Sequence, residues 1–204
     1  MNNAKQILKL LSVLTILLTL VVTTFGLCSF NTGQAYEAVN QYGENIRMWG
    51  SGIYSHDSYF KAPIFIGSDF TILILVVPLT IITFWKTNQK QSIEYLIRSF
   101  SISSLLLYYA ASLALGVTYN HLHLVYIALF SVCLFSVSLM FAKLHSIDIQ
   151  QPKVCLCHYT KGMKVFLLIS GISLFSAWLP DIIISITKGT SLEIYWIYFV
   201  ANDI

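Results

Sequence analysis

Two aspartates interrupt apolar stretches of this sequence, and they are its strongest candidates for chemistry. Asp181 follows Pro180 within residues 178–183, and Asp203 lies beside Asn202 near the end of the last apolar stretch. An aspartate at the centre of a membrane helix costs about 2.5–3.5 kcal/mol. Such a residue is expected to face protein or water and to have a partner. A carboxylate held in this way can bind a proton, a cation or a polar solute.

A structural role is the alternative for the same carboxylates. Asp181 would then accept a hydrogen bond from a backbone N–H freed by a kink at Pro180, or it would cap a half-helix that restarts there. For Asp203 the sequence does not separate the two interpretations.

Histidines and a further aspartate form two short polar groups, His56-Asp57 and His121-x-His123. Imidazole and carboxylate are suitable metal ligands. Neither group has the i, i+4 spacing of a helical zinc motif, however. Histidines at a wet interface are the simpler interpretation, so we predict no metal here.

A third polar group combines Cys155, Cys157 and His158. Its C-x-C spacing differs from the C-x-x-C of common redox and zinc sites. It is therefore only a weak metal candidate, and we predict no cofactor. The sequence also lacks G-x-G-x-x-G, G-x-x-x-x-G-K-[ST], G-x-S-x-G and H-E-x-x-H motifs. An enzyme is not favoured, and an intramembrane enzyme using Asp181 and a histidine ranks last.

The composition indicates a membrane protein. Of the 204 residues, 56% are apolar and 10% are charged, whereas soluble domains have about 25% charged residues. Apolar runs match the ~20 residues that a helix needs to cross a bilayer. The net charge of +3 is small, and the basic residues lie beside the apolar runs. We therefore expect the lipid bilayer as the partner, with other membrane subunits possible and no nucleic acid.

The fold class expected is an all-α transmembrane bundle with five full spans and the start of a sixth. The predicted helices cover residues 6–27, 69–85, 99–119, 122–142, 165–187 and, incompletely, 192–204. Because the last stretch is too short to span a bilayer, we interpret the chain as a fragment. Asp69 is expected to cap the second helix, and Pro78 to kink it.

Residues 29–68 form the longest polar stretch and are rich in aromatic residues. Within it, apolar residues recur every three or four positions, at Tyr36, Val39, Tyr42, Ile46 and Trp49. This spacing predicts a short amphipathic helix over residues 34–49. It would lie at the membrane interface or pack on the mouth of the bundle.

Lysines and arginines predict the orientation. Nine of the twelve fall on the side that holds the N-terminus in this topology. The positive-inside rule then places the N-terminus in the cytoplasm and residues 29–68 outside the cell. We therefore predict a protein of the cell membrane. Asp181 would lie ~24 Å along its helix at 1.5 Å per residue, in the outer half of the membrane. Asp57, Asp69, His56, His121 and His123 are expected in or near the same outer half, and Asp203, beside Asn202, is expected close to the midplane.

Several stretches resemble an uncharacterised group of bacterial multi-pass membrane proteins. The resemblance covers about residues 53–204 and rests on five short motifs: Gly67-Ser68-Asp69 with Pro78-Leu79, Tyr108-Tyr109-Ala110, Tyr119-Asn120, residues 124–131, and Trp178-Leu179-Pro180-Asp181-Ile182. It implies a helical membrane fold that continues beyond Asp203, and it implies no activity.

Two functions remain open. The first is transport or permeation of a small solute or ion through an outer-facing polar cavity. The second is a non-catalytic scaffold, or a sensory or partner-binding subunit, that presents the aromatic outer segment.

Overall fold

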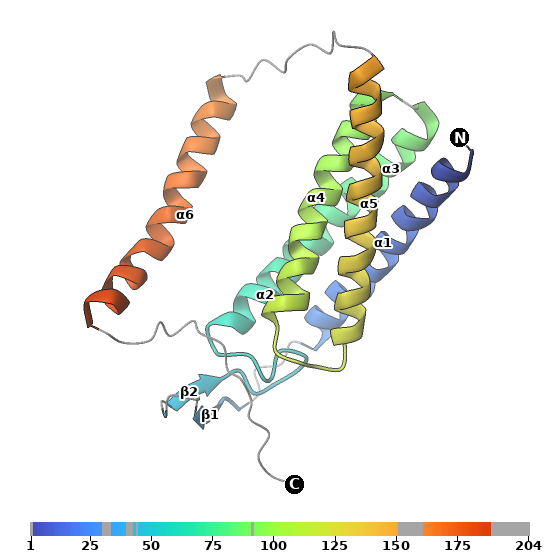
Figure 1. Ribbon diagram of the computed structural model, residues 1–204. Helices are drawn as coiled ribbons and strands as arrows, with labels where there is room; N and C mark the ends of the chain where they lie inside the picture. The colour runs from blue at the N-terminus through green and yellow to red at the C-terminus, as the bar shows by residue number, and fades with distance from the viewer. Residues whose placement is uncertain are drawn as a thin grey trace. The chain divides into compact units, whose positions relative to one another are not determined.

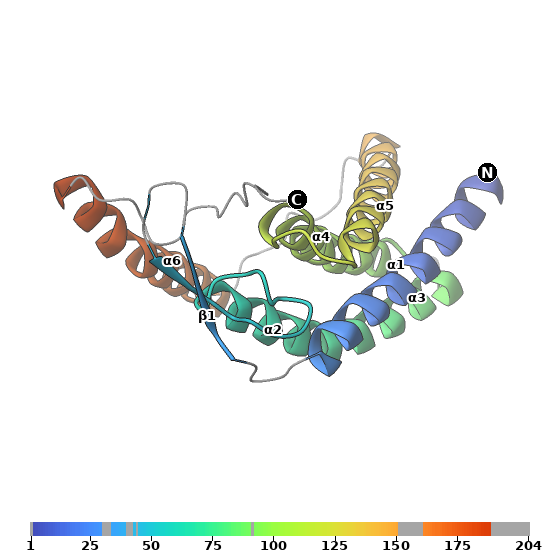
Figure 2. The same ribbon diagram turned by 90° about the horizontal axis from the view of Figure 1, so that it is seen from below.

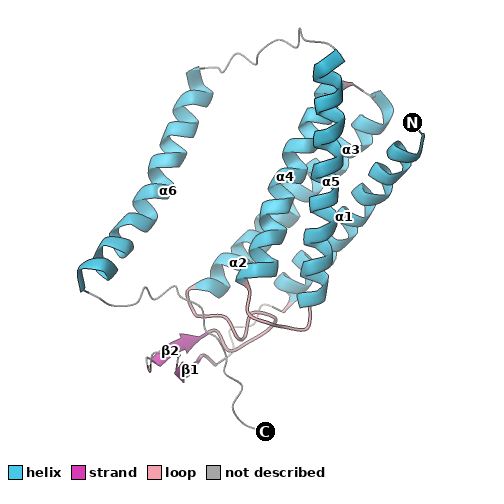
Figure 3. Cartoon of the chain, viewed as in Figure 1, coloured by secondary structure: helices cyan, strands magenta, loops and turns pink. Residues whose placement is uncertain are grey.

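The computed structural model describes residues 2–29, 34–39, 43, 45–90, 92–150 and 161–188. The chain divides into two compact units, and the described part of the first ends at Gln150. Its elements, shown in Figures 1 and 3, are α1 (Asn2–Cys28), β1 (Tyr36–Val39), β2 (Asn45–Met48), α2 (Lys61–Thr71), the π-helix η1 (Ile72–Val76), α3 (Val77–Lys90), α4 (Ile93–Gly116) and α5 (His123–Gln150). The second unit contains α6 (Lys161–Lys188).

Four helical stretches among the described residues are long and apolar enough to cross a membrane. They are Gln6–Cys28, Lys61–Lys90, Ile93–Gly116 and His123–Ser146. The structure therefore supports a mostly helical membrane protein. The expected count of five spans plus a sixth is not confirmed. In α6 the described apolar stretch Lys164–Ser173 is shorter than a span, and residues 192–204 lie outside the described residues.

The second span begins at Lys61 rather than at residue 69. Ser58 starts the helix, because its hydroxyl accepts a hydrogen bond from Lys61 N at 3.2 Å and its carbonyl accepts one from Ala62 N at 3.1 Å. The predicted capping role of Asp69 is therefore wrong. Asp69 lies in the third turn of α2, well inside the helix, where the N–H of Ile72 donates to the carbonyls of Ser68 and Asp69.

The same span departs from α-helical geometry just before Pro78. Residues 72–76 form the π-helix η1, and Val77 N donates to Ile72 O. Proline has no N–H and cannot continue the α-helical hydrogen-bond pattern. The disturbance expected at Pro78 thus takes the form of a π-helix on its N-terminal side.

The predicted amphipathic helix over residues 34–49 is wrong, because this segment forms an antiparallel hairpin. Tyr36 pairs with Met48, and Val39 pairs with Asn45. In β2 the side chains alternate in burial: Ile46 and Met48 face inward, while Asn45 and Arg47 are exposed. This alternation has period two, as expected for a strand. Gly43, with a φ of +80°, lies in the connection and favours a turn over a helix.

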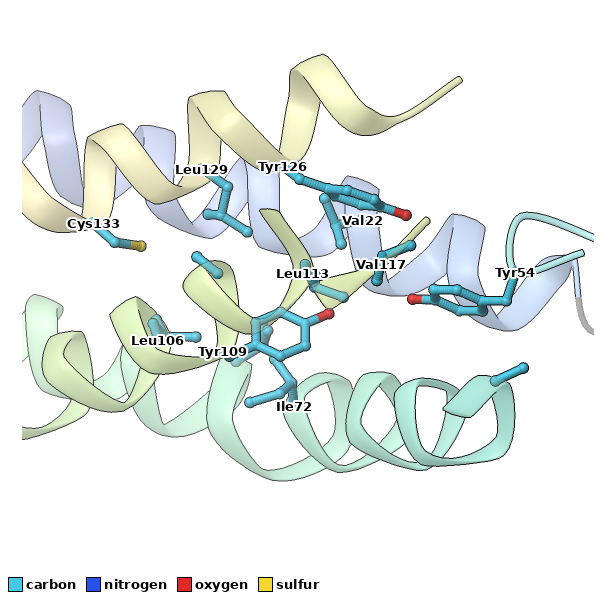
Figure 4. Close-up of a cluster of buried hydrophobic side chains, with 13 residues drawn as sticks. Val22, Tyr54, Ile72, Leu106, Tyr109, Leu113, Val117, Tyr126, Leu129 and Cys133 are labelled. Atoms are coloured by element: carbon cyan, nitrogen blue, oxygen red, sulfur yellow. The ribbon is translucent and has the colours of Figure 1, made fainter. Parts of the chain in front are cut away.

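The first unit is a helical bundle with the hairpin at one end. The helix α5 packs against α4 and α1, and α3 packs against α4 and α1. The hairpin lies at the end where α1 finishes and α2 begins (Figures 1 and 2). The main buried cluster includes Val22, Leu106, Leu113 and Leu129 (Figure 4).

A row of small polar residues on α1 faces the bundle interior. Ser12, Thr15, Thr19 and Thr23 are buried at helical spacing. Ser12, Thr19 and Thr23 each donate to the carbonyl four residues earlier, at 2.7–2.8 Å. Small side chains let helices approach closely in lipid. The next small residue on this face, Gly26, touches the candidate site.

Candidate functional site

The candidate site is centred on Asp69, whose side chain is fully buried at 0% exposure. Both carboxylate oxygens accept hydrogen bonds from tyrosines. Tyr54 Oη donates to Oδ2 at 2.7 Å, and Tyr109 Oη donates to Oδ1 at 2.5 Å. These partners come from the segment before α2 and from α4, so the carboxylate joins three parts of the chain.

Tyr54 is placed by a tightly bonded loop that follows β2. Gly50 N donates to Ser55 O at 3.0 Å, and Asp57 N donates to Tyr54 O at 3.0 Å. The Tyr54 ring stacks on Phe65 of α2, with centroids 5.6 Å apart. The loop therefore directs the hydroxyl inward toward Asp69.

Helix α1 closes the site through Gly26. A Cβ on Gly26 would lie 1.8 Å from Asp69 Oδ2 and 2.9 Å from Asp69 Cγ. Only glycine allows this approach without a shift of the carboxylate. The same Cβ would lie 3.4 Å from Tyr54 Oη, so α1 packs directly against the carboxylate and one of its hydroxyl donors.

The groups that donate hydrogen bonds to the Asp69 carboxylate are uncharged tyrosine hydroxyls. Burial, together with the neighbouring Asp69 carboxylate, raises the pKa of Tyr54 well above its ordinary value. Tyr54 therefore keeps its proton and acts as a donor. Figure 4 shows the hydroxyls of Tyr54, Tyr109 and Tyr126 directed toward the same region. A carboxylate with two hydroxyl donors has the hydrogen bonds that make burial tolerable.

Asn120, in the turn between α4 and α5, extends these contacts toward the end of the bundle. Its Nδ2 donates to Ile53 O at 3.3 Å and to Tyr126 Oη at 3.4 Å. Its Oδ1 accepts from Leu122 N at 2.9 Å. One side chain therefore links the outer loop to the α4–α5 turn.

Asp57 forms a second buried attachment between the outer loop and the helices. At 1% exposure, its Oδ1 accepts from Thr118 N at 3.0 Å and from Thr118 Oγ1 at 2.9 Å. Its Oδ2 is buried and has no hydrogen-bond partner in the part of the chain that the structure describes. Burial raises the pKa of Asp57, and the bonds from Thr118 offset the rise only in part. Asp57 thus anchors the loop to Thr118, the second residue after the end of α4.

The predicted histidines lie on the same end of the unit but do not join the two aspartates through a described hydrogen bond. His56 is exposed, with Nδ1 3.3 Å from Tyr36 Oη, and His121 is also exposed. His123 lies between the rings of Tyr119 and Tyr126, and its Nδ1 is buried without a hydrogen-bond partner. Among the described residues, no three His, Cys, Asp or Glu side chains could hold a metal ion together.

The other predicted site residues lie beyond what the structure describes in atomic detail. Asp181 and Pro180 belong to α6 in the second unit, and their side chains are outside the described set. Asn202 and Asp203 lie outside the described residues, as do the weak metal candidates Cys155, Cys157 and His158. Their roles stay predictions.

Sequence reasoning missed the partners of Asp69. Tyr54 and Tyr109 lie 15 and 40 residues from Asp69, and no local spacing connects them. Gly26 was detectable, because it continues the row of Thr19 and Thr23 at helical spacing. Such a row of small residues indicates where another helix approaches.

Comparisons with known proteins leave the chain without an identified relative. No protein-family model matches it, no curated protein is significantly similar, and no solved structure has a significantly similar fold. The resemblance to uncharacterised bacterial membrane proteins stays a prediction.

Proposed function

We propose that this chain is a non-catalytic membrane component, a scaffold or partner-binding subunit that holds its outer segment in a fixed position on the helices. The observation that carries the proposal is how the Asp69 carboxylate is hydrogen-bonded and buried. Its two oxygens are both bonded to tyrosine hydroxyls, Gly26 of α1 lies directly against Oδ2, and the residue is fully buried. A carboxylate enclosed in this way stabilises packing rather than offering a binding position to a solute.

The outer segment supports the same proposal because it is attached at several places. Asp57 holds it to Thr118, Tyr54 to Asp69, and Asn120 binds the carbonyl of Ile53. It presents exposed aromatic and aliphatic side chains, which are Tyr36, Val39, Tyr59 and Phe60. A rigid surface of this kind suits contact with another membrane subunit or with the lipid interface.

The proposal includes the cell membrane as location, with the N-terminus in the cytoplasm. Support comes from the described basic residues. Lys86 and Lys90 are near the end of α3 and Arg98 near the start of α4, with Lys9 toward the start of α1 and Lys143 toward the end of α5. These four helix ends lie at the end of the bundle that holds the N-terminus (Figure 1). The positive-inside rule assigns such an end to the cytoplasm.

Transport or permeation is the second candidate, and a specific observation favours it. A fully buried aspartate lies in a candidate span, near a helix whose buried face carries Thr15, Thr19 and Thr23. Intramembrane carboxylates often mark ion or proton pathways. On the other hand, the hydroxyls of Thr19 and Thr23 bond to their own helix, which weakens their case as solute ligands.

A proteoliposome experiment separates the two functions. Proton and monovalent-cation fluxes are compared in vesicles with wild type, with Asp69→Asn, and without protein. The scaffold proposal expects wild-type flux equal to that of empty vesicles, together with a lower unfolding temperature for Asp69→Asn in detergent. A saturable wild-type flux that Asp69→Asn abolishes would establish transport instead.

A further inference from the structure

The opposite end of the first unit carries a cluster of three cations around one aromatic ring. We propose that Lys86, Lys90 and Arg98, gathered around Tyr95, bind the headgroup of an anionic phospholipid. This basic cluster joins the end of α3 to the start of α4, and it is independent of the Asp69 site.

The geometry of the basic cluster is compact. Lys86 Nζ lies 6.0 Å, Lys90 Nζ 5.6 Å and Arg98 Cζ 5.4 Å from the centroid of the Tyr95 ring. Distances up to about 6 Å allow a favourable cation–π interaction. The ring therefore holds three positive groups near one another.

The charge of the basic cluster is only partly balanced within the protein. Glu94 pairs with Arg98 at 2.5 Å, and both side chains are mostly exposed. Among the described residues, one carboxylate against three cations leaves a net charge of +2 at this place. Like charges held close together repel one another, so a bound anion would lower the electrostatic free energy.

The connection between the helices is held in place by the hydroxyls of Thr87 and Ser99. Thr87 Oγ1 lies 2.7 Å from Ser99 Oγ, 2.8 Å from Thr83 O and 3.1 Å from Tyr95 O. Thr87 has a single hydroxyl proton, which the two carbonyls share in a three-centre bond, so its contact with Ser99 is one in which Ser99 donates. These bonds fix the backbone of Tyr95 against α3, which orders the cations before a ligand binds.

The position of the basic cluster selects a lipid rather than a soluble anion. It lies where the candidate spans Lys61–Lys90 and Ile93–Gly116 meet. The side chains next to it along each helix, Trp85 at 62% and Ile97 at 42% exposure, are apolar and accessible. A phosphodiester could contact the cations while its acyl chains lie along these residues. Clusters of basic residues beside membrane helices attract anionic lipids.

The test is native mass spectrometry of the full chain in a neutral detergent, titrated with phosphatidylglycerol or phosphatidylcholine. Two variants each lose two positive charges at the same end of the bundle. Lys86→Gln/Lys90→Gln removes them from the basic cluster, and Lys9→Gln/Lys143→Gln removes them elsewhere. Thermal unfolding checks that both variants fold like wild type.

We expect one tightly bound phosphatidylglycerol in wild type and in Lys9→Gln/Lys143→Gln. In Lys86→Gln/Lys90→Gln its affinity should fall by about tenfold or more, since each basic residue near a lipid surface contributes several-fold. Tyr95→Leu should also weaken binding, although it removes no charge. Phosphatidylcholine should bind weakly to all of them.

Three results would overturn the proposal. Equal loss of affinity in both double variants would show diffuse attraction to charge. Equal binding of phosphatidylcholine and phosphatidylglycerol would remove the requirement for an anionic headgroup. Displacement of the lipid by millimolar inorganic phosphate would indicate a site for a soluble anion.

Discussion

At the scale of single residues, the central feature is the contact between a glycine and a carboxylate. Asp69 is buried where Gly26 leaves no room for a side chain on α1. Two tyrosine hydroxyls replace the water that Asp69 would bind in solution. A carboxylate buried without hydrogen-bond partners would strongly destabilise the folded state. The space left by the glycine and the hydrogen bonds from the tyrosines are therefore both needed.

Gly26→Ala is expected to destabilise the protein. The added methyl group would overlap Asp69 Oδ2, and forcing extra atoms into a packed interior costs about 1–3 kcal/mol. The measurement is the thermal unfolding temperature in detergent. Gly67→Ala is the matched control, because nothing lies within 4 Å of its added Cβ and alanine favours a helix by about 0.5–1 kcal/mol.

A double variant shows whether the overlap with Asp69 is the cause. In an Asp69→Ser background the shorter side chain leaves space, so Gly26→Ala should cost clearly less than in wild type. If the two substitutions were simply additive, the contact would not explain the effect.

Asp57 should make stability depend on pH. Burial raises its pKa in the folded state, so the folded chain binds the proton more tightly than the unfolded chain does. The resulting stabilisation is complete below the ordinary aspartate pKa of about 3.9. It is lost as the pH rises through the higher folded value.

The check is the unfolding temperature of wild type and Asp57→Asn from about pH 3.5 to about pH 7. The advantage of wild type over the variant should shrink as the pH rises, because an asparagine side chain at this position cannot titrate. An advantage that grows with pH would mean that the bonds from Thr118 outweigh burial.

At the scale of elements, the outer segment owes its position to a loop with two left-handed glycines. Gly50 has a φ of +80° and Gly52 one of +68°. A Cβ would lie 2.2 Å from Gln34 O at Gly50 and 2.1 Å from Ser29 O at Gly52. The loop therefore lies against the backbone of Ser29, just after α1, and of Gln34, just before β1.

Gly50→Asn should release the outer segment, whereas Gly43→Asn should not. Both glycines have a φ of +80°, which asparagine tolerates better than most residues. Among the described residues, a Cβ at Gly50 meets the backbone, whereas nothing lies within 4 Å of one at Gly43. Limited proteolysis in detergent should therefore cut Gly50→Asn faster near residues 45–60. Equal cleavage of both variants would refute a steric cause.

At the scale of the whole molecule, the described charges are distributed between two ends of the first unit. Five basic residues lie at the end with the N-terminus, which are Lys9, Lys86, Lys90, Arg98 and Lys143, while Arg47 and Lys61 lie at the end with the hairpin. The Asp69 site is close to the hairpin end, and the basic cluster is at the other. The two proposed roles therefore belong to opposite sides of a membrane.

Cysteine labelling in intact cells tests this orientation. In a background with all four native cysteines replaced by serine, Glu37→Cys and Ser92→Cys each introduce an exposed position, one at each end. A membrane-impermeant maleimide should label Glu37→Cys directly, and Ser92→Cys only after the membrane is permeabilised. The reverse pattern would place the N-terminus outside.

The sequence by itself determined that the chain is a helical membrane protein. Apolar runs of span length are a local property, and the structure contains helices at Gln6–Cys28, Ile93–Gly116 and His123–Ser146, close to the expected positions. Helix ends were less predictable. The second span begins at Lys61 because Ser58 supplies the first hydrogen bonds, although Asp69 has an equally suitable side chain for a cap.

Only the tertiary structure decided the hairpin and the site. The spacing of apolar residues in 34–49 fits a helix, but burial of Ile46 and Met48 against the unit selects a strand. The site joins Asp69 to tyrosines far away in sequence, and such pairings depend on how helices and loops pack. Residue type marked Asp69 as polar and costly to bury. The row of small residues on α1 indicated that another helix approaches near Gly26, but its pairing with Asp69 and the two hydroxyls arises only from three-dimensional contacts.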